Sequence, residues 1–198
     1  NATVVQISLP VLTILIAAVV LHERITVRIA LGCGIASLGV LSIIIRGDPA
    51  ILVGLRFNPG DLLILLAQLG LAGYSVLIKF APRVKPLSMV LALCIFGTIY
   101  HLPFLAWELA NGNFVQSGWT GFGGLAFVAV FPSIVAIFLW NYAIEGLGPS
   151  RSGMYMFLMP VFGAALALMF LSEALAWYHV LGTLLIVSGV TLSSWRAR

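Results

Sequence analysis

Long apolar stretches alternate with short polar ones along the whole chain. Seven of them reach the length of about 20 residues that a helix needs to cross a bilayer, roughly 2–21, 27–45, 61–80, 86–109, 121–144, 152–171 and 177–195. Helix breakers separate them, as in RGDPA and EGLGPS. A membrane β-barrel would instead show alternating segments of about 10 residues. The pattern therefore predicts an all-α integral membrane protein with seven transmembrane helices in this chain.

Composition agrees with this prediction, since 62% of the residues are hydrophobic and only 8% are charged. A soluble domain has about 25% charged residues. The ten Lys and Arg residues are scattered between apolar runs, so we expect no nucleic-acid partner. Both cysteines lie inside apolar runs, and we expect no metal or cofactor. GLGPSRSG lacks the Gly-Lys-Ser/Thr ending of a phosphate loop. Because no nucleophile–base motif occurs either, we expect no enzyme.

The basic residues predict the orientation in the membrane. If the connections alternate between two sides, eight basic residues fall on one side and two, Arg46 and Arg56, on the other. The eight are Arg24, Arg28, Lys79, Arg83, Lys85, Arg151, Arg196 and Arg198. Cytoplasmic connections carry such an excess of basic residues. We therefore expect a multi-pass protein of the plasma (inner) membrane with a cytoplasmic C-terminus.

An internal repeat has a constant offset of 150 residues. Ten positions are identical between 1–48 and 151–198, among them Pro10/Pro160, Glu23/Glu173, Gly32/Gly182, Gly39/Gly189 and Arg46/Arg196. The offset corresponds to five helices, an odd number, so the two copies are expected to be inverted in the membrane. Inverted repeats of this kind build carriers with alternating access.

The offset also predicts the domain organisation. Residues 1–48 would be the last two helices of a first repeat, 49–59 a linker, and 60–198 a complete second repeat of five helices. By the same offset the first repeat would begin about 90 residues before Asn1, which is room for three further spans. We therefore expect the intact protein to be a ten-helix bundle of two inverted five-helix repeats.

Several motifs carry a family resemblance. The Pro–apolar run–Leu-x-Glu pattern, the segments LGCGIASLGVL and LGTLLIVSGVT, and the stretch FLWNYAIEGLGPSRSGMYMFLMPVFGAALALMFLSEAL resemble the EamA-type transporters of the drug/metabolite transporter superfamily. The resemblance covers nearly all of the chain. It implies ten helices in two inverted halves, cytoplasmic termini, and a central cavity for metabolites. The implied partners are the lipid bilayer and a small-molecule substrate.

Polar residues inside the spans are the candidates for a substrate site, because such groups usually face the interior of a helix bundle. They are Gln6, Gln68, Ser75, Ser133, Trp140, Asn141 and Tyr155. Amide, hydroxyl and indole groups suit a neutral or zwitterionic solute, such as an amino-acid-like metabolite. The alternative for each residue is an interhelical hydrogen bond that only holds the bundle together.

Glu23 and Glu173 each follow one helix and precede the next. We interpret them as structural residues of two equivalent hairpin turns, and a role in gating or proton transfer is the weaker alternative. The glycine pairs at seven-residue spacing, Gly32/Gly39 and Gly182/Gly189, indicate close helix packing. A homodimer face is a weaker interpretation of the same glycines.

These observations predict a secondary transporter of a small metabolite that works by alternating access. Two other classes stay open. The count of seven helices suggests a receptor, although the repeat argues against one. The three spans expected before Asn1 are not part of this sequence, which leaves a non-transporting scaffold or truncated remnant as the other class.

Overall fold

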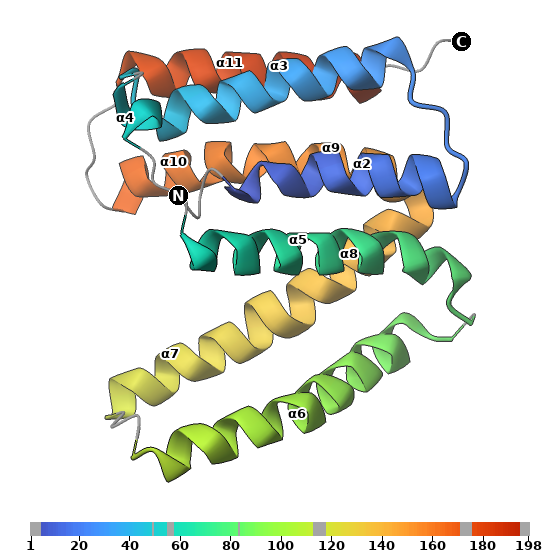
Figure 1. Cartoon of the computed structure of the whole chain (residues 1–198), viewed down its shortest axis with the longest axis vertical. Helices are drawn as coiled ribbons and strands as arrows, with labels where there is room; N and C mark the ends of the chain where they lie inside the picture. Colours follow the sequence, from blue (N-terminus) through green and yellow to red (C-terminus); the bar gives the residue numbers. More distant parts are fainter. Residues whose placement is uncertain are drawn as a thin grey trace. The chain divides into compact units, whose positions relative to one another are not determined.

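The computed structural model describes residues 5–48, 50–54, 58–82, 84–112, 118–170 and 176–194, and these form helices joined by short turns (Figure 1). The α-helices are α2 (Ser8–Val20), α3 (Val27–Ile44), α4 (Ala50–Val53), α5 (Pro59–Leu77), α6 (Pro86–Ala110), α7 (Trp119–Val130), α8 (Ala136–Leu147), α9 (Pro149–Tyr155), α10 (Met159–Phe170) and α11 (Trp177–Ser194). Two 3₁₀ turns, η1 (Ile78–Phe80) and η3 (Met156–Leu158), and one π-helical turn, η2 (Phe131–Val135), continue neighbouring helices.

Six helices within the described ranges are long and apolar enough to cross a membrane, and α2 is a shorter apolar helix. The chain is therefore an all-α integral membrane protein, as the hydropathy pattern predicted. The sixth span begins at Pro149 rather than near 152, because Gly148 adopts a φ of +85° and ends the preceding helix. α4 is an additional helical turn inside the predicted linker.

Local capping explains where two of the helices begin. The Thr26 side chain accepts a hydrogen bond from the Ile29 N–H at the start of α3. At the start of α5, Asn58 and Asp61 bond reciprocally to each other's main-chain N–H, at 3.1 and 2.9 Å. Such caps satisfy main-chain donors that have no partner within the helix.

The chain divides into two compact units. Unit 1 comprises Asn1–Lys79 and Leu147–Arg198, and unit 2 comprises Phe80–Gly146. Unit 1 thus contains helices from both predicted repeats. Within it, α3 lies beside α11, and α2 lies beside both α5 and α9 (Figure 1).

Glycines bring the backbones of α3 and α11 together. A Cβ atom added to Gly32 would lie 2.4 Å from the Gly189 carbonyl oxygen, and one added to Gly39 would lie 2.7 Å from the Gly182 oxygen. Only glycine leaves room for backbones at this separation. The two contacts run in antiparallel order, and exchanging each glycine for its offset partner (Gly32 for Gly182, Gly189 for Gly39) converts one pair into the other.

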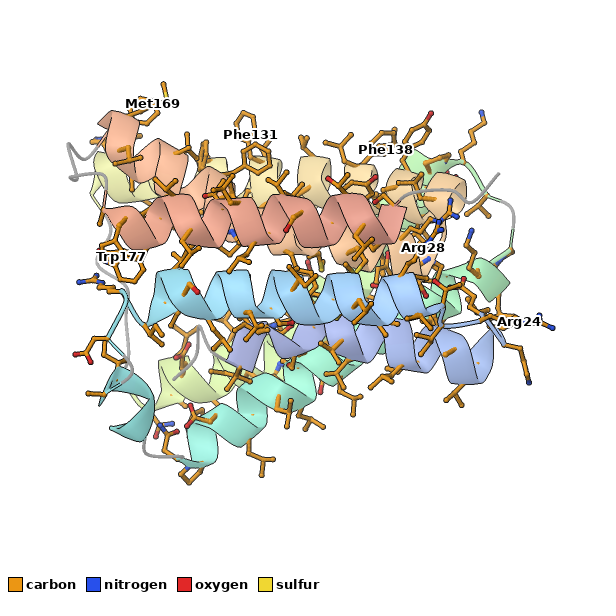
Figure 2. The ribbon with its side chains drawn as sticks, turned by 90° about the horizontal axis from the view of Figure 1, so that it is seen from above. Arg24, Arg28, Phe131, Phe138, Met169 and Trp177 are labelled. Atoms are coloured by element: carbon orange, nitrogen blue, oxygen red, sulfur yellow. The ribbon has the colours of Figure 1, made fainter. Side chains whose placement is uncertain are left out.

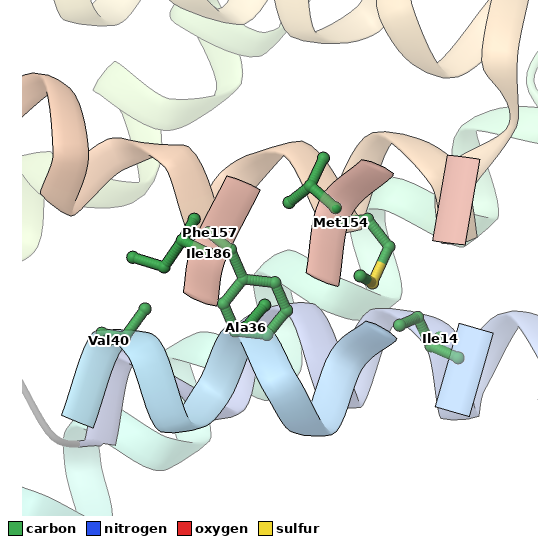
Figure 3. Close-up of a cluster of buried hydrophobic side chains, with 7 residues drawn as sticks. Ile14, Ala36, Val40, Met154, Phe157 and Ile186 are labelled. Carbon is green, nitrogen blue, oxygen red and sulfur yellow. The ribbon is translucent and has the colours of Figure 1, made fainter. Parts of the chain in front are cut away.

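The apolar core of unit 1 fills the space between α3, α11, α2 and the α9–η3 segment (Figure 3). Its buried members are Ile14, Ala36, Val40, Met154, Phe157, Ile186 and Val190. Ala36 and Ile186 are fully buried, and they occupy the same position in the two copies. The copies therefore contribute equivalent positions to one shared core.

Unit 2 consists of α6, α7, η2 and most of α8. The π-helical turn has a local cause, because Pro132 has no N–H to donate to the carbonyl four residues earlier. That carbonyl belongs to Val128, and the Ser133 hydroxyl donates to it at 3.2 Å. The Ala136 N–H then donates to Phe131 O, five residues back. Ser133 thus replaces a main-chain bond that the proline removes.

We predict that Gly32→Ala destabilises the protein, because the new methyl group would overlap the Gly189 carbonyl. Overpacking of this kind costs about 1–3 kcal/mol, which should lower the Tm in detergent by roughly 3–10 °C. Gly34→Ala is the matched control on the same helix, since nothing lies within 4 Å of its added Cβ. Equal Tm values for the two variants would contradict the close packing of α3 on α11.

Candidate functional site

Unit 1 contains a cavity of about 480 Å³. Its lining residues come from the start of the chain and α2, from α3, from α5, and from η3 and α10: Gln6, Ile7, Leu9, Pro10, Val40, Gln68, Leu71, Met156, Phe157, Met159 and Pro160. This volume lies within the range of 300–1,000 Å³ that is usual for small-molecule sites.

Two prolines explain why the helices are irregular at the cavity. Pro160 lies at the second position of α10, directly after the 3₁₀ turn η3. Pro10, its offset partner, is the third residue of α2, and the helical pattern before it is interrupted at Ile7. A proline removes one main-chain hydrogen bond and disturbs the turn before it. Both copies therefore have a distorted turn at the level of the cavity.

The cavity lies where equivalent parts of the two copies meet. Four pairs of its lining residues are related by the offset of 150: Gln6/Met156, Ile7/Phe157, Leu9/Met159 and Pro10/Pro160. Each copy thus contributes the same four positions to the wall. α5 adds Gln68 and Leu71, and α3 adds Val40.

The wall is mainly apolar and contains two amide side chains, Gln6 and Gln68. Gln6 lies directly before α2 in the first copy, and Gln68 lies in α5. α2 and α5 are neighbours. The η3–α10 side presents thioether, phenyl and proline groups from Met156, Phe157, Met159 and Pro160. Amides can orient a polar head by hydrogen bonds, while the apolar part of the wall can accept an apolar tail.

Of the predicted site residues in unit 1, Gln6 and Gln68 line the cavity. Ser75 is fully buried one turn beyond it, and its hydroxyl donates to Leu71 O at 2.8 Å. Tyr155 is 42% exposed and does not line the cavity. Its hydroxyl accepts a hydrogen bond from Ser194 at 3.4 Å.

The other three predicted residues belong to unit 2. Ser133 bonds within its own helix, as described above. Trp140 is half-buried, and Asn141 is 4% exposed. Their role in a substrate site stays a prediction.

Sequence reasoning did not identify the apolar wall, above all Met156, Phe157 and Met159. Apolar residues are no signal by themselves in a chain of this composition. The repeat could have found them, since each is the offset partner of a residue before or within α2. Applying the offset to Gln6 leads directly to Met156.

Glu23 makes a contact that the turn interpretation did not include. Its carboxylate accepts a hydrogen bond from the hydroxyl of Ser150, 127 residues away at the start of α9. A Cβ added to Gly148 would lie 3.5 Å from the Glu23 Oε1 atom. Glu173 lies outside the described residues, and the predicted turn role of both glutamates stays a prediction.

Helices of membrane-spanning length around a cavity of this size define a polytopic membrane protein with room for a small solute. Within the described residues, no group of three or more His, Cys, Asp or Glu side chains could hold a metal ion. The chain belongs to the EamA-like transporter family, whose sequence model it matches over residues 58–195.

Three relatives of the chain are described as transporters or exporters. The chain is 27% identical to an uncharacterized transporter of Bacillus subtilis, YyaM, over 93% of this chain and 61% of that protein. It is 26% identical to a probable terminal-alkyne amino-acid exporter of Streptantibioticus cattleyicolor, over 92% and 60%. It is also 27% identical to the uncharacterized transporter YcxC of Bacillus subtilis, over 98% and 64%. The chain thus spans less than two thirds of the length of these relatives.

We predict that the cavity is accessible to water. A cysteine at position 68 should react with a charged thiol reagent, because a cavity-lining thiol can ionise in contact with water. A cysteine at Leu69, which does not line the cavity, should react at least about tenfold more slowly, because a thiol in an apolar environment stays protonated. Mass spectrometry of the labelled protein measures both rates. Equal rates would show that Gln68 does not face an aqueous cavity.

Proposed function

We propose that the intact protein is a secondary transporter that moves a small neutral or zwitterionic solute, such as an amino acid with an apolar side chain, by alternating access. The observation that carries this proposal is the cavity between positions related by the offset of 150, whose mainly apolar wall contains the amides of Gln6 and Gln68. Sites at the interface of inverted repeats are typical of alternating-access carriers.

The chemistry of the wall supports this class of substrate. Uncharged amides can donate to a carboxylate and accept from an ammonium group, so they suit a zwitterion or a neutral polar head. None of the lining residues is charged. A solute with a large net charge would lose its hydration there without a compensating ion pair.

The relatives support a carrier rather than a receptor or an inert scaffold. One of them is described as a probable terminal-alkyne amino-acid exporter, and three others are described as uncharacterized transporters. The repeat and the match to a transporter family add to this argument.

The test is solute flux in proteoliposomes that contain the purified intact protein. Radiolabelled leucine, methionine and norleucine are the first probes, with arginine and glutamate as charged comparisons. We expect saturable flux for the apolar amino acids and little for the charged ones. An absence of flux for neutral solutes of this size would favour the scaffold.

We predict that Gln68→Ala weakens solute binding, because the polar head of the solute would lose a hydrogen-bond partner in a desolvated site. A loss of about 1–3 kcal/mol corresponds to an apparent affinity that is roughly ten- to a hundredfold lower. Competition of labelled leucine flux by unlabelled leucine measures the change. Leu69→Ala, one residue away from the lining position, should leave the affinity within about twofold, and a comparable loss there would refute the assignment.

We further propose that the C-terminus is cytoplasmic. In unit 1, Arg24 and Arg28 lie at one end of the helices and Trp177 lies at the opposite end (Figure 2). Arg151 follows Ser150, which contacts Glu23 at the arginine end. A C-terminal alkaline phosphatase fusion, which is active only outside the cytoplasm, should therefore be inactive, and a green fluorescent protein fusion should fluoresce. The reverse pattern would overturn this orientation.

A further inference from the structure

We propose that the hydrogen bond between Ser150 and Glu23 is a latch that holds the cavity closed toward one end of unit 1. This is the end at which Arg24 and Arg28 lie, and we name it the basic end. Glu23 belongs to the connection between α2 and α3, in the first predicted copy, and Ser150 directly precedes the second copy, 151–198. The proposal rests on the proposed transport cycle. It adds the contact that must break when the cavity opens to that side.

The geometry of the latch is built by the residues around it. Ser150 is 7% exposed, so its hydroxyl is withdrawn from bulk water while it donates to the Glu23 carboxylate. A hydrogen bond to a charged group is stronger than one between neutral groups. Gly148, with its φ of +85°, keeps the backbone beside the carboxylate free of a side chain. A side chain there would be strained and would crowd the latch.

Buried residues, which we name the seam, lie along the helices between the latch and the cavity. They are Thr13 and Ala17 of α2, Ala72, Ser75 and Val76 of α5, and Ser152 and Gly153 of α9, and α2 contacts both of the other helices. Most of these side chains are small, so the helices approach closely. A Cβ added to Gly153 would lie 3.4 Å from the Thr13 Cβ atom.

The order of cavity and seam is the same on every helix that forms them. In α2 the chain passes from Pro10 in the cavity to Thr13 and Ala17 in the seam, and then to Glu23. In α5 it passes from Gln68 in the cavity to Ser75 in the seam. α9 and α10 run in the opposite direction, from Ser150 through the seam to Pro160. The seam therefore lies between the cavity and the basic end along each of these helices.

The opposite side of the cavity has no comparable layer among the described residues of α10. This helix, Met159–Phe170, buries none of its residues. Leu9 in α2 is 8% exposed, whereas its offset partner Met159 is 68% exposed. Within unit 1, the described buried layer therefore lies on the latch side of the cavity, and α10 adds none on the other side.

Ser152 lowers the stability of the closed state. Its hydroxyl is buried in the seam, at 1% exposure, and has no hydrogen-bond partner among the described residues. A buried hydroxyl without a partner favours any state in which it can be hydrated. The two serines therefore act in opposite directions, since Ser150 stabilises the closed seam and Ser152 destabilises it.

The test measures access to the cavity from the basic end. The reporter is Gln68→Cys in the intact protein, in a background without other cysteines, in membrane vesicles whose predicted cytoplasmic side faces outward. A charged, impermeant thiol reagent is added to that side. We expect Ser150→Ala and Glu23→Ala each to raise the labelling rate about tenfold, because a hydrogen bond to a charged group is lost. The double variant should label no faster than the single variants, since both remove the same bond.

Matched serine variants sharpen the test. Ser152→Ala should lower the labelling rate, because it removes the unpartnered hydroxyl from the seam. Ser150→Thr keeps a hydroxyl and should label at nearly the original rate. Ser42→Ala is the control for loss of a serine, since its hydroxyl donates to Leu38 O of its own helix. It should leave the rate unchanged.

Three results would each overturn the latch: unchanged labelling in both Ser150→Ala and Glu23→Ala, additive increases in the double variant, or an increase of the same size in Ser42→Ala. Should Glu23→Ala fail to fold, Glu23→Gln keeps an acceptor oxygen without the charge and should give an intermediate rate. Labelling requires no solute, so a failure of the latch is distinguishable from a failure of the transport assay.

Discussion

The close contact of the α3 and α11 backbones is the interaction on which the rest of unit 1 depends. Within a bilayer the hydrophobic effect does not draw helices together, so association depends on packing and hydrogen bonds. Glycine at the two contact levels lets the main chains approach to distances that any Cβ atom would prevent. The antiparallel pair then fixes which faces of the two copies meet, and so where Pro10 and Pro160 face one cavity.

Hydropathy was sufficient to predict the six long apolar helices of the described residues, because lipid leaves the main chain no partner for its hydrogen bonds outside regular structure. Val27–Ile44 and Trp177–Ser194 agree with their predicted spans, 27–45 and 177–195, to within one residue. The seven-residue spacing of the glycines also predicted close packing, since two such residues share one face of a helix. The glycine spacing did not identify the partner helix, because any helix with a small-residue stripe would fit it.

The candidate site was less predictable, for reasons visible in individual residues. Gln6 and Gln68 carry a polar signal inside apolar spans and were found. Ser133 carries the same signal, but its hydroxyl replaces a bond that Pro132 removes, which depends on the local backbone path. Met156 and Met159 are indistinguishable in sequence from lipid-facing residues. The contact of Ser150 with Glu23 joins positions 127 residues apart and follows only from the folded chain.

The pairing of Gln6 with Met156 has a consequence for how such a protein can diversify. Two identical subunits related by a two-fold axis would have to place the same side chain on both halves of a shared wall. A single polypeptide with two copies is free of that constraint, because each codon can change alone. The wall can then hold an amide at one position and a thioether at the equivalent position, and its two halves can differ in chemistry.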